Sequence, residues 1–227
     1  MKKSVLFLLL IAILSCNTKK EKLQIERKVF NELFFELIDS SYIDWRLISP
    51  PSDPPPPPNG IVISEKQKRE NLENHKKFLA EFEKRKAEIE KDTTRIVLAI
   101  VEKTFPLDSS SFKNLYGNYK EIELKSKYSN SKKENKIDLS IFGNHKKYRF
   151  KKYSEFPKGR KIWRTNYPFE LGAVISFSNI YFDENKEYGI LECGVTRGRL
   201  NGNGLRFFIK KVSGKWKIEK IEGTWIS

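Results

Sequence analysis

The last third of the chain alternates apolar and polar residues in successive runs separated by short turns. Ala173 to Phe182, Tyr188 to Val195 and Leu205 to Ile209 each carry the side-chain period of two that is typical of β-strands. A fourth run begins at Trp216 and ends near Ser227. Strands joined by turns of a few residues pair with their neighbours in sequence. This pattern predicts a four-strand antiparallel meander.

The fourth run contains an irregularity. Its apolar positions slip by one residue between Ile218 and Ile221, and such a slip moves the following side chains to the other face of the sheet. A β-bulge absorbs one extra residue and so corrects the slip. We therefore expect a bulge or bend near Lys220.

The Gly-rich stretch from Arg197 to Gly204 allows two interpretations. Asn201-Gly202 and Asn203-Gly204 are common hairpin-turn pairs, where a positive φ is needed. Backbone amides in such a loop can also bind an anion, with Arg197 and Arg199 assisting. We favour the turn and keep the two arginines as candidate anion-binding residues.

Two helices separated by a proline-rich segment precede the sheet residues. The spacing of apolar residues from Leu23 to Ile38 predicts an amphipathic helix, with outward positions that include Glu26, Glu32 and Glu36. Residues 48–60 include five consecutive prolines, which favour either a stiff loop or a ligand for an aromatic groove, and we favour the loop.

The second helix is expected over Glu65 to Lys91, capped by Ser64 and Gln67. Its apolar stripe is thin, and charged residues dominate the rest of its surface. A surface helix on its own domain is favoured over a partner-binding coiled coil.

After Asp92 the composition becomes typical of strands. We expect strands at Arg95 to Val101, Glu121 to Lys127, Ile137 to Phe142 and Tyr148 to Tyr153, and a loop or short helix at Leu107 to Tyr119. The fold class predicted is α+β, with two N-terminal helices beside a mostly antiparallel sheet that ends in the meander, in a cone-like arrangement as one form. We expect four segments. Residues 1–15 and 16–22 form two short N-terminal segments, residues 23–91 hold the two helices with their proline-rich loop, and residues 92–227 form a sheet-rich α+β domain.

Positive charge is concentrated in the middle of the chain. The net charge is +15, and residues 113–164 contain 16 Lys or Arg against 5 Asp or Glu. A basic face attracts acidic proteins, acidic glycans or anionic lipids. Its candidate partner-binding residues are Lys146, Lys147, Lys151 and Lys152.

The first sixteen residues have the pattern of an export signal. Lys2 and Lys3 precede an apolar stretch, Val5 to Leu14, that is too short to span a bilayer, and Ser15-Cys16 follow at once. This pattern resembles the lipobox of bacterial lipoproteins, which implies removal of residues 1–15 as a signal peptide, lipidation (palmitate) of Cys16 and a short tether over 16–22. The resemblance also implies a lipid-anchored protein of the bacterial cell envelope, with the outer membrane favoured because Asn17 is not Asp. Nucleic acid is not expected as a partner of an exported protein.

The C-terminal third adds a second resemblance. Its elements are Ser178 within a strand, Phe182 before a charged turn, Gly202 and Gly204, the hairpin Gly214-Lys215-Trp216, and the ending Trp225-Ile226-Ser227. This pattern resembles a family of uncharacterised bacterial lipoproteins, whose members often have a second Cys in the Gly-rich loop. Here Arg199 or its neighbours stand at that place, so Cys193 has no disulfide partner once Cys16 carries lipid. The resemblance implies a fold and a location in the cell envelope, and it implies no activity.

No catalytic or metal-binding motif is found. His75 and His145 lack metal-ligand spacing, and no C-x-x-C, G-x-S-x-G or P-loop pattern occurs. We expect no metal and no cofactor, and a buried, inert Cys193. The chain is interpreted as a non-enzymatic, membrane-tethered binding module that uses its basic face. The alternatives are a small-ligand-binding or enzymatic pocket in a cone-like α+β domain, and an immunity-type lipoprotein.

Overall fold

The chain divides into two compact units. A computed structural model describes residues 24–44, 46, 64–91, 95–120, 134–143 and 145–227. One unit joins the described residues up to Tyr42 with those from Ile96 onward, and the other spans Ile43–Arg95. The first helix, residues 24–41, therefore belongs with the sheet, whereas the sequence led us to group it with the second helix in 23–91. The segments expected at 1–15 and 16–22, the proline-rich residues 48–60 and the strand expected at Glu121 to Lys127 lie outside the described residues.

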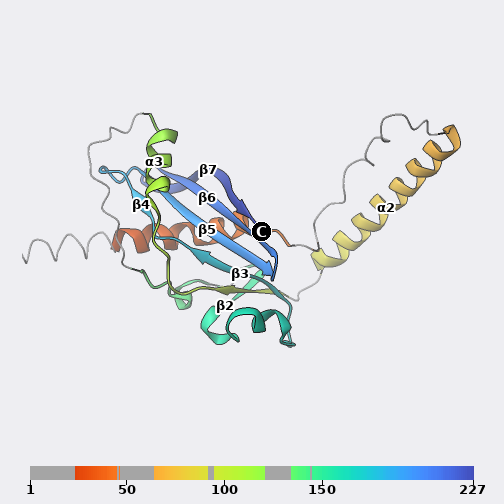
Figure 1. Cartoon of the computed structure of the whole chain (residues 1–227), viewed down its shortest axis with the longest axis horizontal. Coiled ribbons are helices and arrows are strands. Elements are labelled where there is room, and N and C mark those ends of the chain that lie inside the picture. Colours follow the sequence, from red (N-terminus) through yellow and green to blue (C-terminus); the bar gives the residue numbers. More distant parts are fainter. Residues whose placement is uncertain (1–23, 45, 47–63, 92–94, 121–133, 144) are drawn as a thin grey trace, which may run out of the picture. The chain divides into compact units, whose positions relative to one another are not determined.

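The first unit is built on one mixed sheet of seven strands, which confirms the α+β class (Figure 1). Its order is β2-β1-β3-β5-β6-β7, and β4 pairs with β5. The strands are β1 (Ile96–Ile100), β2 (Tyr148–Lys152), β3 (Leu171–Phe177), β4 (Tyr181–Phe182), β5 (Tyr188–Gly198), β6 (Asn201–Val212) and β7 (Lys215–Ile226).

The antiparallel part of the sheet is the predicted meander. β3, β5, β6 and β7 are successive neighbours, and the pairings between them are antiparallel. In the β6–β7 ladder, Phe208 pairs with Lys220 while Ile209 pairs with Ile218, so Glu219 is the extra residue of a bulge. The bulge predicted near Lys220 is confirmed.

The parallel part was not anticipated from the sequence. β1 pairs in parallel with both β2 and β3, and its five apolar residues are buried. A strand covered on both faces reads as a continuous apolar run, and this is the pattern of Ile96 to Ile100. The parallel pairing places the carboxyl ends of β1, β2 and β3 at one edge of the sheet.

Helix 24–41 covers one face of this sheet (Figure 1). Its apolar side chains join those of the strands in the main core, where Phe34 stacks on Phe142 with ring centroids 3.8 Å apart. Two of its glutamates bind the sheet region: Glu32 is exposed, as expected, whereas Glu26 is buried, contrary to the outward placement expected. Glu26 is buried and accepts a hydrogen bond from the Ile180 amide (2.5 Å), and Glu32 accepts one from the Trp216 amide (3.0 Å).

The opposite face is covered by two separate segments. Helix α3 (Ser109–Asn118) lies over Ile190 and Phe208. The 3-10 turns η3 (Tyr153–Glu155) and η4 (Gly159–Arg164), with the residues between them, lie over β1. Another 3-10 turn, η2 (Leu139–Ile141), stands where we expected a strand from Ile137 to Phe142, so that prediction was wrong. The Asp138 side chain accepts hydrogen bonds from the Ser140 amide and hydroxyl, which favours a turn over an extended strand.

The Gly-rich stretch belongs mostly to strands β5 and β6. Our prediction that the hairpin turn lies at Asn201-Gly202 or Asn203-Gly204 was therefore wrong. The hairpin turn is Arg199-Leu200, and Gly202 and Gly204 lie inside β6 without a positive φ. A Cβ added at either glycine would meet the indole of Trp225 on β7. These glycines are needed for the close approach of a neighbouring ring and not for a turn.

The second unit contains helix α2 (Glu65–Lys91). Its start matches the predicted cap, because the Ser64 hydroxyl accepts a hydrogen bond from the Gln67 amide (3.2 Å). Among the described residues, the search for a helix with the length and apolar character needed to cross a membrane finds none.

Candidate ligand-binding cleft

An open cleft of about 750 Å³ lies where β1 and β2 end. Because these strands are parallel, the residues that follow them emerge at the same edge of the sheet, where ligands of open parallel sheets commonly bind. The lining residues are Val101, Glu102, Lys103, Glu134, Asn135, Lys136, Tyr153, Ser154, Phe156 and Lys158. Its volume is that of a small-molecule site.

Residues 134–136 line the cleft because their segment pairs with residues 102–104, which follow β1. The Thr104 amide donates to the Asn135 carbonyl (3.0 Å), and the Ile137 amide donates to the Glu102 carbonyl (2.7 Å). Lys103 and Lys136 form an antiparallel bridge between these segments. Backbone pairing, and not local sequence, therefore brings Lys136 next to Lys103.

The two carboxylates of the cleft are already engaged by protein groups. The Glu102 side chain accepts hydrogen bonds from the Ser154 amide (3.2 Å) and from its hydroxyl. Burial alone raises the pKa of Glu102, but the bonds from Ser154 and the nearby Lys152 charge outweigh it and lower the pKa. Glu134 pairs with Lys103 (2.9 Å), and this bond raises the pKa of Lys103. Glu134 is thus paired with a cation, whereas Glu102, bonded to the neutral Ser154, keeps its negative charge with Lys152 nearby.

Two exposed lysines of the cleft carry donors that no described carboxylate pairs with, and one buried amide beside it lacks a described partner. Within the described part of the chain, Lys136 and Lys158 form no ion pair. The side-chain nitrogen of Asn135 is buried and has no hydrogen-bond partner among the described residues. A buried amide group without a partner is costly, and a ligand atom or a water molecule that accepts its hydrogen bond relieves that cost.

A polar network under the cleft holds this edge together. Thr104 accepts a hydrogen bond from the Asn135 amide (2.8 Å) and its hydroxyl bonds the side-chain oxygen of Asn179, which follows β3. A small cavity of about 20 Å³ adjoins these residues and is lined in part by Glu26, Asn135 and Ser178. That space matches one water molecule. The residues that follow β1 and β3 are thus tied to each other and to residue 135.

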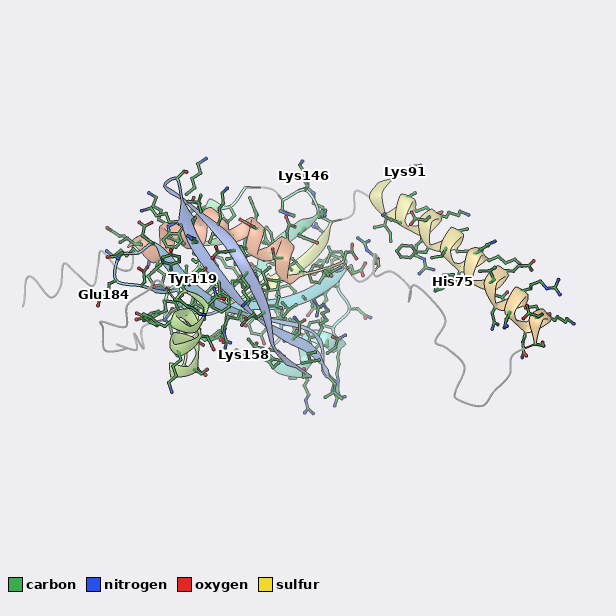
Figure 2. The ribbon with its side chains drawn as sticks, turned by 90° about the horizontal axis from the view of Figure 1, so that it is seen from above. His75, Lys91, Tyr119, Lys146, Lys158 and Glu184 are labelled. Carbon is green, nitrogen blue, oxygen red and sulfur yellow. The ribbon has the colours of Figure 1, made fainter. Side chains whose placement is uncertain are left out.

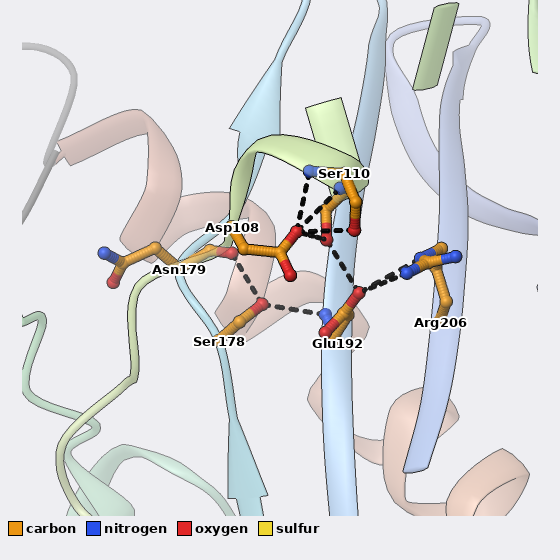
Figure 3. A network of polar contacts seen from close by, with 7 residues as sticks. Asp108, Ser110, Ser178, Asn179, Glu192 and Arg206 are labelled. Atoms are coloured by element: carbon orange, nitrogen blue, oxygen red, sulfur yellow. Dashed lines mark hydrogen bonds and ion pairs between the residues drawn. The ribbon is translucent and has the colours of Figure 1, made fainter. Parts of the chain in front are cut away.

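A second polar network joins α3 to the sheet (Figure 3). The Ser111 hydroxyl donates to Glu192 on β5 (2.7 Å), and Arg206 on β6 binds the same carboxylate oxygen (2.7 Å). Asp108 caps α3 by accepting hydrogen bonds from the Ser110 and Ser111 amides. The pKa of Asp108 is lowered, chiefly by the hydrogen bond from the Ser110 hydroxyl. The residues drawn in Figure 3 include no histidine or cysteine, and their contacts either cap α3 or join α3, β5 and β6. We interpret this network as structural.

The lysines predicted from the sequence fall into two groups at opposite ends of β2. Lys151 and Lys152 close the strand beside the cleft, where Lys151 pairs with Glu155 (3.2 Å) and Lys152 acts electrostatically on Glu102. Lys146 and Lys147 precede the strand, at the far end from the cleft, and are exposed. Figure 2 shows Lys146 and Lys158 well apart on the sheet unit.

The two candidate arginines lie at the end of β5, which is the end of the sheet away from the cleft. Arg197 donates to the Asn203 side chain (2.6 Å) and lies over the ring of Tyr42, 5.8 Å from its centroid. Arg199 is exposed in the hairpin turn. No single site therefore holds all six predicted basic residues.

The remaining candidates have structural surroundings or lie outside the described residues. His145 stacks on Tyr148 with ring centroids 4.9 Å apart and lies 3.4 Å from Asp39. Cys193 is buried, as predicted, and burial raises the pKa of its thiol to about 12. Cys16 is not among the described residues. A search of the described residues for three or more clustered metal-ligating side chains finds none.

Sequence reasoning identified the basic segment that contains Lys136 and Lys158 but missed the site. The only local signal was the basic bias of residues 113–164, which includes both lysines but not Lys103. The chain matches no protein-family model, no curated protein and no solved structure.

Proposed function

We propose that this chain is a lipid-anchored envelope protein that binds a small anionic ligand in the cleft at the carboxyl ends of β1 and β2. The cleft carries the proposal, because among the described residues Lys136 and Lys158 offer cationic donors outside any ion pair, while Glu134 is paired with Lys103 and Glu102 accepts from Ser154. The export signal and Cys16 in the sequence support the anchored location.

The ligand class follows from the chemistry of the lining. Lys136 and Lys158 favour carboxylate or phosphate groups, and Tyr153 and Phe156 add aromatic surface beside them. A cleft of about 750 Å³ accommodates a molecule of one or two sugar units better than the broad surface of a protein. An acidic sugar or the acidic end of a glycan meets both requirements.

The cleft supports binding more than catalysis. The described lining residues offer no histidine, no cysteine and no pair of free carboxylates, which are the usual acid–base and nucleophilic groups. Ser154 donates its hydroxyl hydrogen bond to the Glu102 carboxylate, but among the described lining residues this pair has no histidine or second carboxylate beside it to complete a catalytic triad.

The test is isothermal titration calorimetry of the chain from Asn17 onward, with glucuronic acid, inorganic phosphate and glucose each titrated separately. Glucuronic acid binding that is lost in the double variant Lys136→Met, Lys158→Met, with glucose inactive, supports the proposal. The matched control is Lys217→Met, an exposed lysine on β7. Phosphate binding without glucuronic acid binding would reassign the ligand to phosphate compounds. Equal binding by the double variant, or no binding of either anion, would overturn the proposal.

A further inference from the structure

Helix α2 carries a seam of exposed and half-buried residues with coiled-coil spacing. The seam positions follow one another at intervals of three and four residues, which is the heptad spacing. They are Leu72, His75, Leu79, Phe82, Lys86 and Ile89. Leu72 is 55% exposed and Leu79 is 40% exposed, while Phe82 and Ile89 are half-buried, so part of the apolar side of this helix is in contact with solvent. Phe78, directly beside the seam, is 46% exposed.

A helix this polar gains little stability from its own sequence. Isolated helices in water are marginal, and most helical stability in proteins comes from packing an apolar face. Three adjacent apolar side chains with exposures of 40% or more mark a face suited to association. The charges that flank the seam decide which partner fits.

We infer that α2 pairs with α2 of a second copy of this chain, in the antiparallel direction. In one antiparallel register Leu72 of one copy faces Ile89 of the other, and Leu79 faces Phe82. By symmetry each contact occurs twice, so four apolar layers form. The two remaining layers place His75 opposite Lys86, which weakens the pair and limits it to a modest affinity.

The charges beside the seam are complementary in this register. Lys76 of one copy lies opposite Glu83 of the other, again twice by symmetry. Phe78 lies opposite Arg85, an arrangement suited to a cation–π contact. A parallel pair would instead place Lys86 against Lys86 in the seam and bring Glu83 next to Phe78. The flanking charges therefore favour the antiparallel direction.

This inference is independent of the cleft, because α2 belongs to the other compact unit. The first experiment is sedimentation equilibrium of the chain from Asn17 onward. We expect a monomer–dimer equilibrium that weakens about tenfold in Lys76→Glu, which turns two attractive contacts into repulsive ones. The double variant Lys76→Glu, Glu83→Lys should restore dimerisation. The matched control Lys77→Glu, one residue further round the helix and away from the seam, should leave it unchanged.

The direction of pairing is tested by disulfide formation. A mixture of a Leu72→Cys chain with a differently tagged Ile89→Cys chain should form the mixed disulfide on oxidation. The Leu72→Cys chain alone should not link to itself. Circular dichroism of each variant confirms that α2 stays helical. A purely monomeric chain, equal effects of Lys76→Glu and Lys77→Glu, or self-linking at position 72 would each overturn the inference.

Discussion

The indole of Trp225 lies where a side chain of residue 204 would stand. Gly204 pairs with Trp225 across the β6–β7 ladder, and a Cβ on Gly204 would overlap the Trp225 ring. The same ring reaches Gly202 and Gly194, where added Cβ atoms would lie 3.2 and 3.6 Å from it. Three glycines on two strands thus form the floor on which one tryptophan packs, and the terminal Trp and the Gly-rich stretch are one structural feature.

We expect Gly204→Ala to destabilise the sheet unit by about 1–3 kcal/mol, because the new methyl group overlaps Trp225 and forces the strand pair apart. Urea unfolding of the chain measures this free energy. The penalty should be smaller in a Trp225→Ala background, which shows that the two positions are coupled. Gly223→Ala on β7 is the control, since nothing lies within 4 Å of a Cβ there. Equal losses for both glycine variants would contradict this account.

The cap of α3 should contribute a pH-dependent share of stability. Asp108→Ala removes the acceptor for the Ser110 and Ser111 amides and should cost about 1 kcal/mol, whereas Asp108→Asn should keep most of the cap. The folded-state pKa of Asp108 is lowered, so its contribution is present above the unfolded pKa and is lost as the pH falls through the folded value. The difference between wild type and Asp108→Ala in urea unfolding should therefore shrink in acid. A difference that is constant with pH would argue against the cap.

Cys193 should be unreactive until the chain unfolds. In a chain that begins at Asn17 it is the single thiol, so a chromogenic thiol reagent reports on it alone. We expect no labelling of the native protein at pH 8 and complete labelling in denaturant, because the thiol is buried and its pKa is raised to about 12.

The raised pKa of the Cys193 thiol also lowers the stability of the protein in alkali. The stabilisation from keeping this thiol neutral is complete below the unfolded pKa, near 9.0, and is lost as the pH rises toward 12. Cys193→Ala should remove that part of the alkaline loss. Fast reaction of the native protein with the thiol reagent at pH 8 would contradict the burial of Cys193.

The contact between Glu192 and Arg206 should be energetically coupled to α3. Their side chains are 22% and 16% exposed, and Ser111 donates to the same carboxylate oxygen. A double-mutant cycle of Glu192→Gln and Arg206→Met, read by urea unfolding, should give a coupling free energy of about 1 kcal/mol. The exposed pair Lys66–Glu70 on α2 serves as the comparison and should couple by less than about 0.5 kcal/mol. Equal coupling in the two pairs would contradict the structural role assigned to the network.

Local sequence patterns predicted the elements that depend on neighbours in the chain. The period of two in the last third and the slip after Ile218 predicted the meander and its bulge, because side-chain alternation and register are local properties of a strand. The Ser64 cap of α2 was predicted for the same reason. The prediction for the Gly-rich stretch failed since glycine also serves close packing, and the ring that requires it is Trp225, more than twenty residues away in the sequence.

Only the tertiary structure decided what lies at the carboxyl ends of the parallel strands. β1 and β2 pair across nearly fifty residues, and no local period records which distant strand is a partner or in which direction it runs. The same is true of Lys103 and Lys136, which meet through backbone pairing. It is also true of Glu26: the helical period predicted an exposed side chain, but a hydrogen bond from the Ile180 amide keeps it buried. The sequence by itself determined the basic composition of the chain and its local elements. The cleft exists because long-range hydrogen bonding brings residues together that the sequence keeps apart.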